Sequence, residues 1–420
     1  MLSKEQLKQV LSEQWAAFLK KDLGVERAAL SSVGEKLKLP HVVVLSGLRR
    51  CGKSTLMRQI VKKYYSDESF YYVSFEDERL KDFDASQFND VYEALVELFG
   101  EQKAFFIDEI QNVEGFEAFV RRFYDAGFKF FISGSNARLL SRELGTKLTG
   151  RHVDLVVRPF SFKEFLALRK FHFSKEILYK SEGRAACKRL FGEYLEKGGM
   201  PEYLVYGNPE VLARVYDDIV IKDIAVRHGV ENVAQLRELY KYLVANFSNK
   251  FSLNSLKKLL NFGSANTVKA YVSYLEQAYF VSVASKFDYS LKKQLVNDKK
   301  LYVVDNAFVP VLSAKTTKDN GRMLENLVFN ALNENCSVFY FGNGSECDFV
   351  TVEKNELELA VQVCWELTGG NRERELAGLS ACMSSLKVKR GLVLTYDQEE
   401  ELVLEGRKVQ VKPVWKWMLE

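Results

Sequence analysis

Proline and cysteine are scarce in this 420-residue sequence, which contains six of each. So few prolines leave little room for disordered linkers. The cysteines are scattered and form no C-x-x-C pair, which argues against both a zinc site and a disulfide framework. We therefore expect reduced thiols, most of them buried.

Long apolar runs are also missing. No stretch approaches the roughly 18 uncharged apolar residues of a membrane helix, and the N-terminus lacks the apolar region of a signal peptide. These absences predict a cytoplasmic protein with no membrane partner. The composition, 47% hydrophobic and 28% charged, indicates a globular protein with ample core material.

The length predicts several domains. At about 150 residues per domain the chain holds two to four, and we expect three. The net charge of +4 is unevenly distributed, because residues 237–300 contain eleven Lys/Arg and four Asp/Glu. This basic segment predicts either contact with a polyanion or a solvated basic surface, and charge alone favours the second.

The sequence GLRRCGKS at residues 47–54 matches the phosphate-binding loop pattern G-x-x-x-x-G-K-[ST]. An apolar run of strand length precedes it at residues 41–45, and residues 54–61 have helical spacing. Strand, loop and helix therefore follow in the required order, which makes nucleotide chemistry the first hypothesis.

The residue types of this loop suit a nucleotide phosphate. Its glycines let backbone N–H groups surround a β-phosphate. Lys53 can reach the β- and γ-phosphates, and the Ser54 hydroxyl can ligate Mg²⁺. The predicted nucleotide-binding residues are Gly47, Arg50, Gly52, Lys53, Ser54 and Thr55.

Two further strands are expected at residues 70–75 and 103–109. The second has four apolar residues followed by Asp108 and Glu109, the Walker B arrangement, which puts carboxylates at the carboxyl end of a buried parallel strand. Asp108 would hold Mg²⁺, and Glu109 would orient and activate the attacking water. Together with the loop, this pair predicts hydrolysis as well as binding.

A fourth strand is expected at residues 128–133, followed by Ser135 and Asn136. These two residues suit a sensor of the γ-phosphate or the attacking water, or equally a turn and helix cap before a helix at residues 137–140.

An arginine is expected to stabilise negative charge in the transition state. Arg151 is the first candidate for this catalytic role. Arg49, Arg50 and Arg158 compete with it, and for any one of them a surface ion pair is the alternative.

Several motifs together resemble a known family of ATPases. They are GLRRCGKST, FFIDEIQ, FISGSNARLL, LTGR and RPFSFKEFL, with KGGMPEY and KDI further along the chain. They resemble the bacterial and archaeal P-loop ATPases of the AAA-related STAND branch, in particular a group with a winged-helix-like segment and a C-terminal nuclease-like domain. The resemblance implies a parallel five-stranded core with ATP at the strand ends. The chain has no guanine-specifying N-K-x-D.

The middle of the chain has the winged-helix order of three helices and a hairpin. Helices are expected at residues 236–247, 252–260 and 265–277, and strands at residues 279–284 and 300–305. Lysines suited to phosphate contacts are Lys257, Lys258, Lys269, Lys292 and Lys293, and Asn266 and Lys269 could read bases. Winged helices also bind proteins or cover ATPase domains, so double-stranded DNA and a protein remain alternative partners.

The last hundred residues resemble the PD-(D/E)XK nuclease arrangement but depart from it. Glu325 and Asp348 match the helix acid and the strand acid, whereas Gln362 and Cys364 stand where an acid and a lysine are needed. A glutamine oxygen binds Mg²⁺ poorly, and a thiol cannot supply the charge of lysine. We therefore expect an inactive nuclease-like fold with a vestigial site.

These observations predict an α/β protein. Its expected parts are a P-loop NTPase parallel sheet core at residues 1–165, a helical extension and winged-helix-like segment at residues 166–310, and a restriction-endonuclease-like domain at residues 311–420. The leading hypothesis is a cytoplasmic ATPase that uses Mg²⁺ and ATP and whose nucleotide state repositions the other modules. The alternative is a nucleic-acid-binding regulator that uses ATP as a slow switch. Self-association is left open, as is a protein partner.

Overall fold

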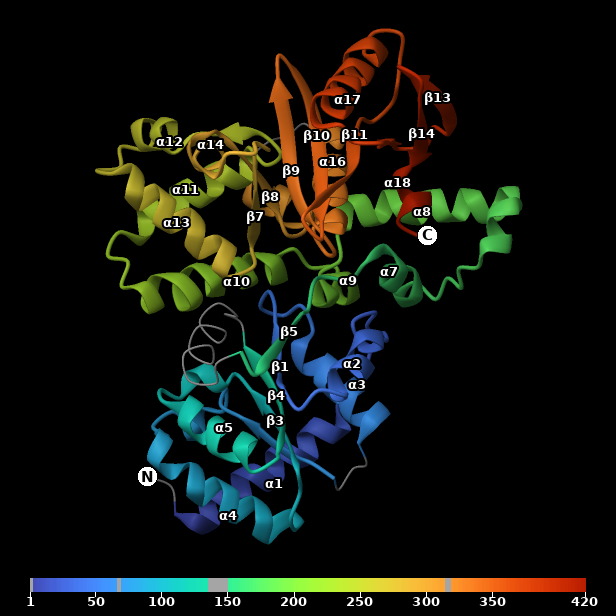
Figure 1. The fold of residues 1–420 in the computed structure, drawn as a ribbon. Helices are drawn as coiled ribbons and strands as arrows, with labels where there is room; N and C mark the ends of the chain where they lie inside the picture. Colours follow the sequence, from blue (N-terminus) through green and yellow to red (C-terminus); the bar gives the residue numbers. More distant parts are fainter. Residues whose placement is uncertain (1–2, 66–68, 135–149, 314–318) are drawn as a thin grey trace. The chain divides into compact units, whose positions relative to one another are not determined.

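The computed structural model describes residues 3–65, 69–134, 150–313 and 319–420. The chain folds into two compact units, residues 1–158 and 159–420, and each is described here by itself (Figure 1). No helix in the described residues is long and apolar enough to cross a membrane. All six cysteines are free and five are buried, as the sequence predicts.

The first unit is built on a five-stranded parallel sheet with the order β2-β3-β4-β1-β5. The strands are β1 (Val42–Ser46), β2 (Tyr71–Ser74), β3 (Ala104–Asp108), β4 (Lys129–Gly134) and β5 (His152–Val156). Every residue of β1 and β3 is buried, as expected for parallel strands covered on both faces. The predicted parallel core is confirmed.

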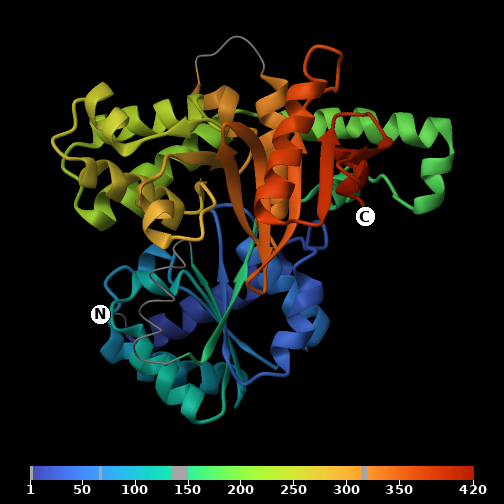
Figure 2. The same cartoon turned by 45° about the horizontal axis from the view of Figure 1, so that its top comes forward.

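Helices cover both faces of this sheet, as Figure 2 shows. They are α1 (Lys4–Lys20), α2 (Leu30–Leu37), α3 (Lys53–Tyr64), α4 (Phe88–Phe99) and α5 (Phe116–Asp125), with short helices η1 (Glu78–Leu80), η2 (Ala85–Gln87) and η3 (Ile110–Asn112). Leu95 of α4 and Val120 of α5 share one core cluster with Phe105 of β3. On the other face Tyr65, at the end of α3, packs edge-on against Phe106. Both faces of β3 are thus covered by helices or their ends.

The second unit begins with a helical region. It contains α7 (Phe162–Leu168), η4 (Lys175–Tyr179), α8 (Ser181–Lys197), α9 (Pro201–Tyr206), α10 (Glu210–Asp218), the π-helix η5 (Ile219–Val226) and α11 (Val233–Ala245). Gly198 and Gly199 join α8 to α9. Asp305 accepts hydrogen bonds from the N–H groups of Gly199, at 2.6 Å, and Ala307, at 2.8 Å. A Cβ on Gly198 would collide with Asp305, and one on Gly199 with the Phe160 carbonyl. Packing therefore explains the two glycines of the KGGMPEY motif.

A three-stranded antiparallel sheet follows, with the order β6-β8-β7. Its elements along the chain are β6 (Lys250–Phe251), α12 (Leu253–Leu259), α13 (Ala265–Gln277), β7 (Val281–Ser285), α14 (Leu291–Val296) and β8 (Lys299–Val303). Helices α11, α12 and α13 and strands β7 and β8 lie close to the expected positions, whereas β6 and α14 were not predicted. Helix α14 has too short an apolar pattern to be recognised, and β6 has only two residues.

The last part of the second unit is a six-stranded mixed sheet with the order β13-β14-β12-β11-β10-β9. It is formed by β9 (Ser337–Asn343), β10 (Ser345–Glu353), β11 (Glu356–Val363), β12 (Arg390–Thr395), β13 (Glu400–Leu404) and β14 (Arg407–Pro413), with α15 (Phe308–Leu312), α16 (Asn320–Leu332), α17 (Arg372–Leu386) and α18 (Val414–Trp417). Met383 of α17 packs in a cluster with Val350 of β10. Phe329 of α16 lies against the ring of Phe349, the neighbouring β10 residue, so the two helices cover opposite faces.

The first unit ends at residue 158, near the expected domain boundary at 165. The boundaries at residues 165 and 310, and hence the division into three domains, stay predictions.

Candidate functional site

The phosphate-binding loop connects the buried strand β1 to helix α3. Gly47 has φ 141° and Gly52 has φ 102°, values that L side chains rarely adopt. A Cβ on Gly47 would also collide with the Val157 carbonyl. Lys53 is buried, and its ammonium donates hydrogen bonds to the Gly47 and Leu48 carbonyls, each at 3.1 Å. The loop therefore has the backbone conformation that its glycines predict, with the lysine folded against it.

The carboxyl ends of three adjacent strands meet beside this loop. The Ser54 hydroxyl, at the start of α3, donates to Asp108 Oδ2 at 2.7 Å. Ser133 of β4 donates to the other oxygen of the same carboxylate. The order β3-β4-β1 explains this meeting, because β4 lies between the strand that ends in Asp108 and the strand that leads to the loop. The two residues predicted to hold Mg²⁺ thus lie in direct contact.

Glu109 follows β3 in a left-handed backbone conformation, with φ 53° and ψ 43°. Its N–H donates to Ser133 Oγ at 3.4 Å, and its carboxylate accepts a hydrogen bond from the Gln111 amide. Burial raises the pKa of Glu109, Lys53 and Arg49 act to lower that pKa, and Asp108 acts to raise it. This conformation is uncommon for a non-glycine residue.

Two residues that were not predicted support the site. Ser133 is the first, and its position at the end of β4, one strand from Asp108, is the signal that could have identified it. Arg27 is the second. It is buried, and its guanidinium donates to the Cys51 carbonyl in the loop at 2.6 Å and to the Arg158 carbonyl at 2.5 Å. No local motif marks Arg27, because it comes 20 residues before the loop.

Arg151, the first candidate for the catalytic arginine, lies at the amino end of β1. It immediately precedes β5, and its carbonyl accepts from Val42 N at the amino end of β1, whereas the loop follows the carboxyl end of β1. Its side chain is 48% exposed and pairs with Asp125 at 2.8 Å. The length of a strand therefore separates Arg151 from the loop of the same chain, and this geometry does not bring it to a bound γ-phosphate.

The remaining predicted residues of the first unit have different positions. Arg49 lies 3.9 Å from Glu76, and Arg50 has φ 60° within the loop. Thr55 Oγ1 accepts from Arg58 at 2.9 Å on α3. Ser135 and Asn136, the two sensor candidates, lie outside the described residues, as does the helix expected at residues 137–140.

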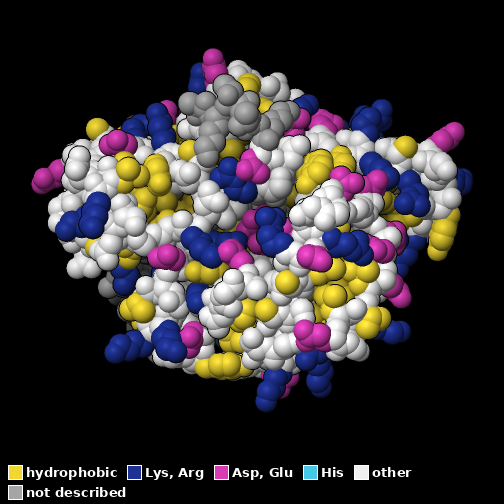
Figure 3. Space-filling view, turned by 90° about the horizontal axis from the view of Figure 1, so that it is seen from above, with side chains coloured by type: hydrophobic (Ala, Val, Ile, Leu, Met, Phe, Trp, Pro, Cys, Tyr) yellow, Lys and Arg dark blue, Asp and Glu magenta, His cyan; other side chains and the backbone are white. Residues whose placement is uncertain are grey.

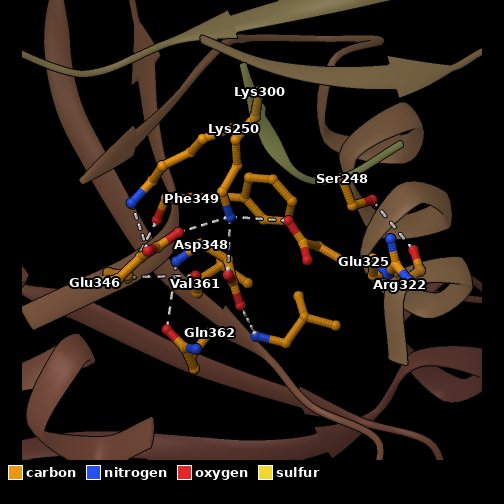
Figure 4. A network of polar contacts seen from close by, with 12 residues as sticks. Ser248, Lys250, Lys300, Arg322, Glu325, Glu346, Asp348, Phe349, Val361 and Gln362 are labelled. Carbon is orange, nitrogen blue, oxygen red and sulfur yellow. Dashed lines mark hydrogen bonds and ion pairs between the residues drawn. The ribbon is translucent and has the colours of Figure 1, made fainter. Parts of the chain in front are cut away.

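A second polar cluster lies within the second unit, around Lys300 of β8 (Figure 4). The Lys300 ammonium is 3.1 Å from Glu325 Oε1, 2.9 Å from Glu346 Oε1 and 3.4 Å from Asp348 Oδ1. The lysine side chain is only 5% exposed. Burial acts to lower its pKa, but the three carboxylates outweigh burial, so the pKa of Lys300 is raised. The structure thus joins the predicted Glu325 and Asp348 through a lysine that was not predicted.

The two acids of this cluster are held by further hydrogen bonds. Tyr302 donates to Glu325 at 2.8 Å, and Val363 N donates to Asp348 Oδ2 at 2.9 Å. Burial and the neighbouring Asp348 raise the pKa of Glu325 to about 7, against the opposing effect of Lys300. Burial also raises the pKa of Asp348.

Gln362 and Cys364 have defined structural places in β11 and just after it. The Gln362 carbonyl oxygen accepts from Asp348 N at 3.3 Å, and its amide donates to Glu375 at 2.6 Å. Cys364 belongs to the core cluster beneath α17, and burial raises its thiol pKa to about 12. Gln362 therefore uses both halves of its amide on the protein, and Cys364 is a neutral thiol.

A cavity of about 1140 Å³ opens beside the Lys300 cluster. Its walls come from α11, β6, α12, α16 and β10, and they include Ser252, Lys258 and Arg322 along with the clustered lysine and acids. The cluster is therefore accessible to small solutes from one side.

Comparison with known proteins finds matches in both units. A family model described as "AAA domain" matches residues 40–166, and a model for a domain of unknown function (DUF8612) matches residues 188–319. The chain is 33% identical over 404 residues to the uncharacterized protein MJ1544 of Methanocaldococcus jannaschii, covering 91% of this chain and 89% of that protein. It is 29% identical over 399 residues to an uncharacterized protein of Haemophilus influenzae, covering 90% and 94%.

The solved structure of the Walker-type ATPase PABY2304 of Pyrococcus abyssi aligns with a TM-score of 0.40 and 16% identity, over 69% of this chain and 95% of that one. The extent of the match to MJ1544 is what assigns the family. The chain belongs to the same protein family as MJ1544, and its first unit carries an AAA domain of the P-loop ATPase class.

Proposed function

We propose that the first unit binds Mg-ATP and hydrolyses it to ADP and phosphate. The observation that carries this proposal is the contact between Ser54 and Asp108 at 2.7 Å, beside the buried Lys53. A hydroxyl and a carboxylate oxygen in contact are the protein ligands that Mg²⁺ uses in P-loop enzymes. Displacing their hydrogen bond with Mg²⁺ would put the ion next to the loop that holds the phosphates.

Glu109 is the proposed residue that orients and activates water. It directly follows Asp108. Its pKa is raised toward the pKa that a general base needs. Ser133 and Arg27 are proposed as positioning residues, the first for Asp108 and the second for the loop. Arg49 replaces Arg151 as the cation proposed at the γ-phosphate in the same chain, because it lies in the loop and its charge acts on Glu109.

Release of inorganic phosphate from ATP by the full chain tests this proposal. Lys53→Ala and Glu109→Gln should abolish release, and Glu109→Gln should still bind ATP because it leaves the loop intact. Glu101→Gln is a matched control, since Glu101 is exposed and precedes the opposite end of the same strand β3. Unchanged phosphate release in both Lys53→Ala and Glu109→Gln would refute hydrolysis at this site.

The middle of the second unit is proposed to be a winged-helix-like module. Helix α11, strand β6, helices α12 and α13 and the hairpin β7-β8 follow in that order, and the sheet order β6-β8-β7 places the first strand beside the third. In α13, Asn266 and Lys269 are exposed, as are Lys258 of α12 and Lys292 of α14. These residues support double-stranded DNA as a partner, with ATP acting as a slow switch in that alternative.

Electrostatics limits this alternative. On the face shown in Figure 3, basic and acidic side chains are interspersed and do not form one patch of a single sign. Several basic residues of the segment also pair with acids, for example Arg237 with Asp217 and Lys250 with Glu346. The ATPase rate with and without double-stranded DNA, at low and high salt, separates the two functions. DNA stimulation that disappears at high salt supports the coupling, whereas no effect of DNA directs attention to a protein partner.

The six-stranded sheet with α16 and α17 is proposed to be a nuclease-like fold without cleavage activity. Gln362 and Cys364 support this, because each is committed to the protein and neither supplies the missing charge. A plasmid-cleavage assay with Mg²⁺ tests it. Cleavage that is lost in Asp348→Ala would show an active nuclease.

A further inference from the structure

The cluster around Lys300 combines groups that usually bind a metal with a group that repels one. Glu325 comes from α16, and Glu346 and Asp348 come from the same strand, β10. Carboxylates that converge in this way from separate elements are the ligands of hard divalent cations such as Mg²⁺ and Mn²⁺. Here the point of convergence holds the Lys300 ammonium, at 2.9 to 3.4 Å from one oxygen of each acid.

The position of this ammonium is determined by the fold. Lys300 lies within β8, between the paired strands β6 and β7, so its backbone is held on both sides. Its side chain is 5% exposed and its ammonium contacts the carboxylates at the wall of the adjoining cavity. Lys250, the neighbour of Lys300 in the β6-β8 register, contacts only the outer acid, Glu346, at 2.6 Å and is 39% exposed. The two lysines therefore differ in depth, and only Lys300 reaches Glu325 and Asp348.

The charges in this cluster disfavour a divalent cation while both lysines are present. Two ammonium groups, Lys300 and Lys250, face three carboxylates. A divalent cation added to both lysines would leave the site with excess positive charge, whereas the same cation with Lys250 alone would balance the three acids. Sterics act in the same direction, because metal-to-oxygen distances of about 2.0 to 2.6 Å require the place that the ammonium occupies.

We propose that Lys300 is the built-in cation of this cluster and that it closes a latent divalent-metal site formed by Glu325, Glu346 and Asp348. In the native chain the acids bind the ammonium and no metal ion enters. Removal of the ammonium opens a site for Mg²⁺ or Mn²⁺ that is reached through the adjoining cavity. This inference concerns the second unit and does not depend on ATP hydrolysis.

The contacts of Gln362 agree with this proposal. Its amide donates to Glu375 at 2.6 Å, and a carboxylate at position 362 would place two acids in direct contact there. Glu375 also pairs with Arg374 at 2.5 Å. A fourth acid near Asp348 is thus paired away from Lys300, and the three acids of the proposed site are those that contact its ammonium.

The test is a titration of the full chain with Mn²⁺, without nucleotide, followed by calorimetry and by thermal unfolding. Wild type should show no Asp348-dependent Mn²⁺ binding. Lys300→Met, which keeps the length of the side chain and removes its charge, should bind one Mn²⁺ at least ~10-fold more tightly than wild type, with carboxylate ligands of the expected type. Adding Asp348→Asn to Lys300→Met should remove this binding.

Lys250→Met is the matched control. It removes a lysine from the same ladder and the same cluster, yet leaves Lys300 in place, so it should create no Mn²⁺ site. If Lys300→Met is poorly folded, Mn²⁺ should raise its unfolding temperature and should fail to do so in the double variant. Asp348-dependent binding of Mn²⁺ by wild type would overturn the proposal. Failure of Mn²⁺ either to bind or to stabilise Lys300→Met would overturn it as well.

Discussion

Each unit contains a buried lysine and a buried aspartate in its polar site, with Asp108 at the end of β3 and Asp348 within β10, but the lysines have different partners. In the first unit Lys53 donates to two backbone carbonyls, and Asp108 is contacted by the hydroxyls of Ser54 and Ser133. In the second unit the ammonium of Lys300 contacts the carboxylates themselves. In our proposals a metal ion replaces the hydroxyl hydrogen bonds at Asp108, whereas at Asp348 it would compete with a cation that belongs to the chain. Residue type alone therefore does not determine whether an acidic site accepts a metal.

The sharpest test of this contrast compares the stability of the two lysine variants. Lys300→Met should lower the free energy of unfolding by about 3–5 kcal/mol in metal-free buffer, because it leaves buried carboxylates without their cation. Lys53→Met should change stability far less, since the Lys53 ammonium donates to neutral backbone carbonyls and forms no close ion pair among the described residues. Urea unfolding of both variants measures the difference. Equal losses of stability would contradict the contrast between the sites.

The effects of lysine variants on ATP turnover should have the opposite order, with the larger loss at Lys53. Lys53→Ala should lower the rate of ATP turnover at least ~100-fold, which corresponds to about 3 kcal/mol in the activation barrier. Lys300→Met should leave the turnover of the folded protein in the absence of DNA within about 2-fold of wild type. Phosphate release measured below the unfolding temperature of each variant distinguishes the two effects. A large loss of turnover in folded Lys300→Met would show that the sites are coupled.

The carboxylate of Asp305 is buried and held by backbone N–H groups, so its titration should affect the stability of the fold. Burial raises its pKa to about 6 from the usual 3.8, against the hydrogen bonds from Ala307 and Gly199. The folded state therefore binds a proton more tightly than the unfolded state, and this contribution to stability is present below about pH 4 and is lost as the pH rises through 6. The loss is about 3 kcal/mol.

Asp305→Asn removes the titration and should flatten the pH dependence of the unfolding free energy between pH 4 and 6. It should also lower stability at every pH, because an asparagine offers one acceptor oxygen where two N–H groups require two. Urea unfolding across this pH range measures both effects. A slope unchanged from that of wild type would assign the pH dependence to other groups.

The smallest effect is expected for Arg151. Arg151→Ala removes a half-exposed ion pair with Asp125 and should change stability by about 0.5 kcal/mol or less. Turnover should stay within about 2-fold of wild type, because Arg151 lies at the end of the sheet away from the loop. A loss of turnover that depends on protein concentration would instead show that this arginine acts on a neighbouring molecule.

The predicted nucleotide site could be identified in the sequence because its main parts are local. A phosphate-binding loop needs its glycines, lysine and hydroxyl within eight residues, and the flanking strand and helix are read from neighbouring residues. Asp108 and Glu109 are likewise identified by the apolar strand before them. The position of Arg151 could not be read in the same way, because a motif carries no information about which end of a strand meets the loop. That position depends on the register of β5 with β1.

The helices and hairpin of the middle segment were also readable from local patterns, whereas the Lys300 cluster was not. Lys300 is 25 residues from Glu325 and 48 residues from Asp348 along the chain. As one of several lysines in a basic segment, it was counted as surface charge. Only the pairing of β8 with β6 and β7, and the packing of α16 and β10 beside it, removes this lysine from solvent.

The sequence by itself thus determined the pattern of a phosphate-binding loop, an acid pair in the Walker B arrangement and an altered acidic motif near its end. The tertiary structure decided which side chains share each acid: Ser54 and Ser133 with Asp108, and Lys300 with Glu325, Glu346 and Asp348. The physical reason is the short range of these interactions. Hydrogen bonds and ion pairs act over a few ångströms in space, and strand order and packing alone decide which distant residues come that close.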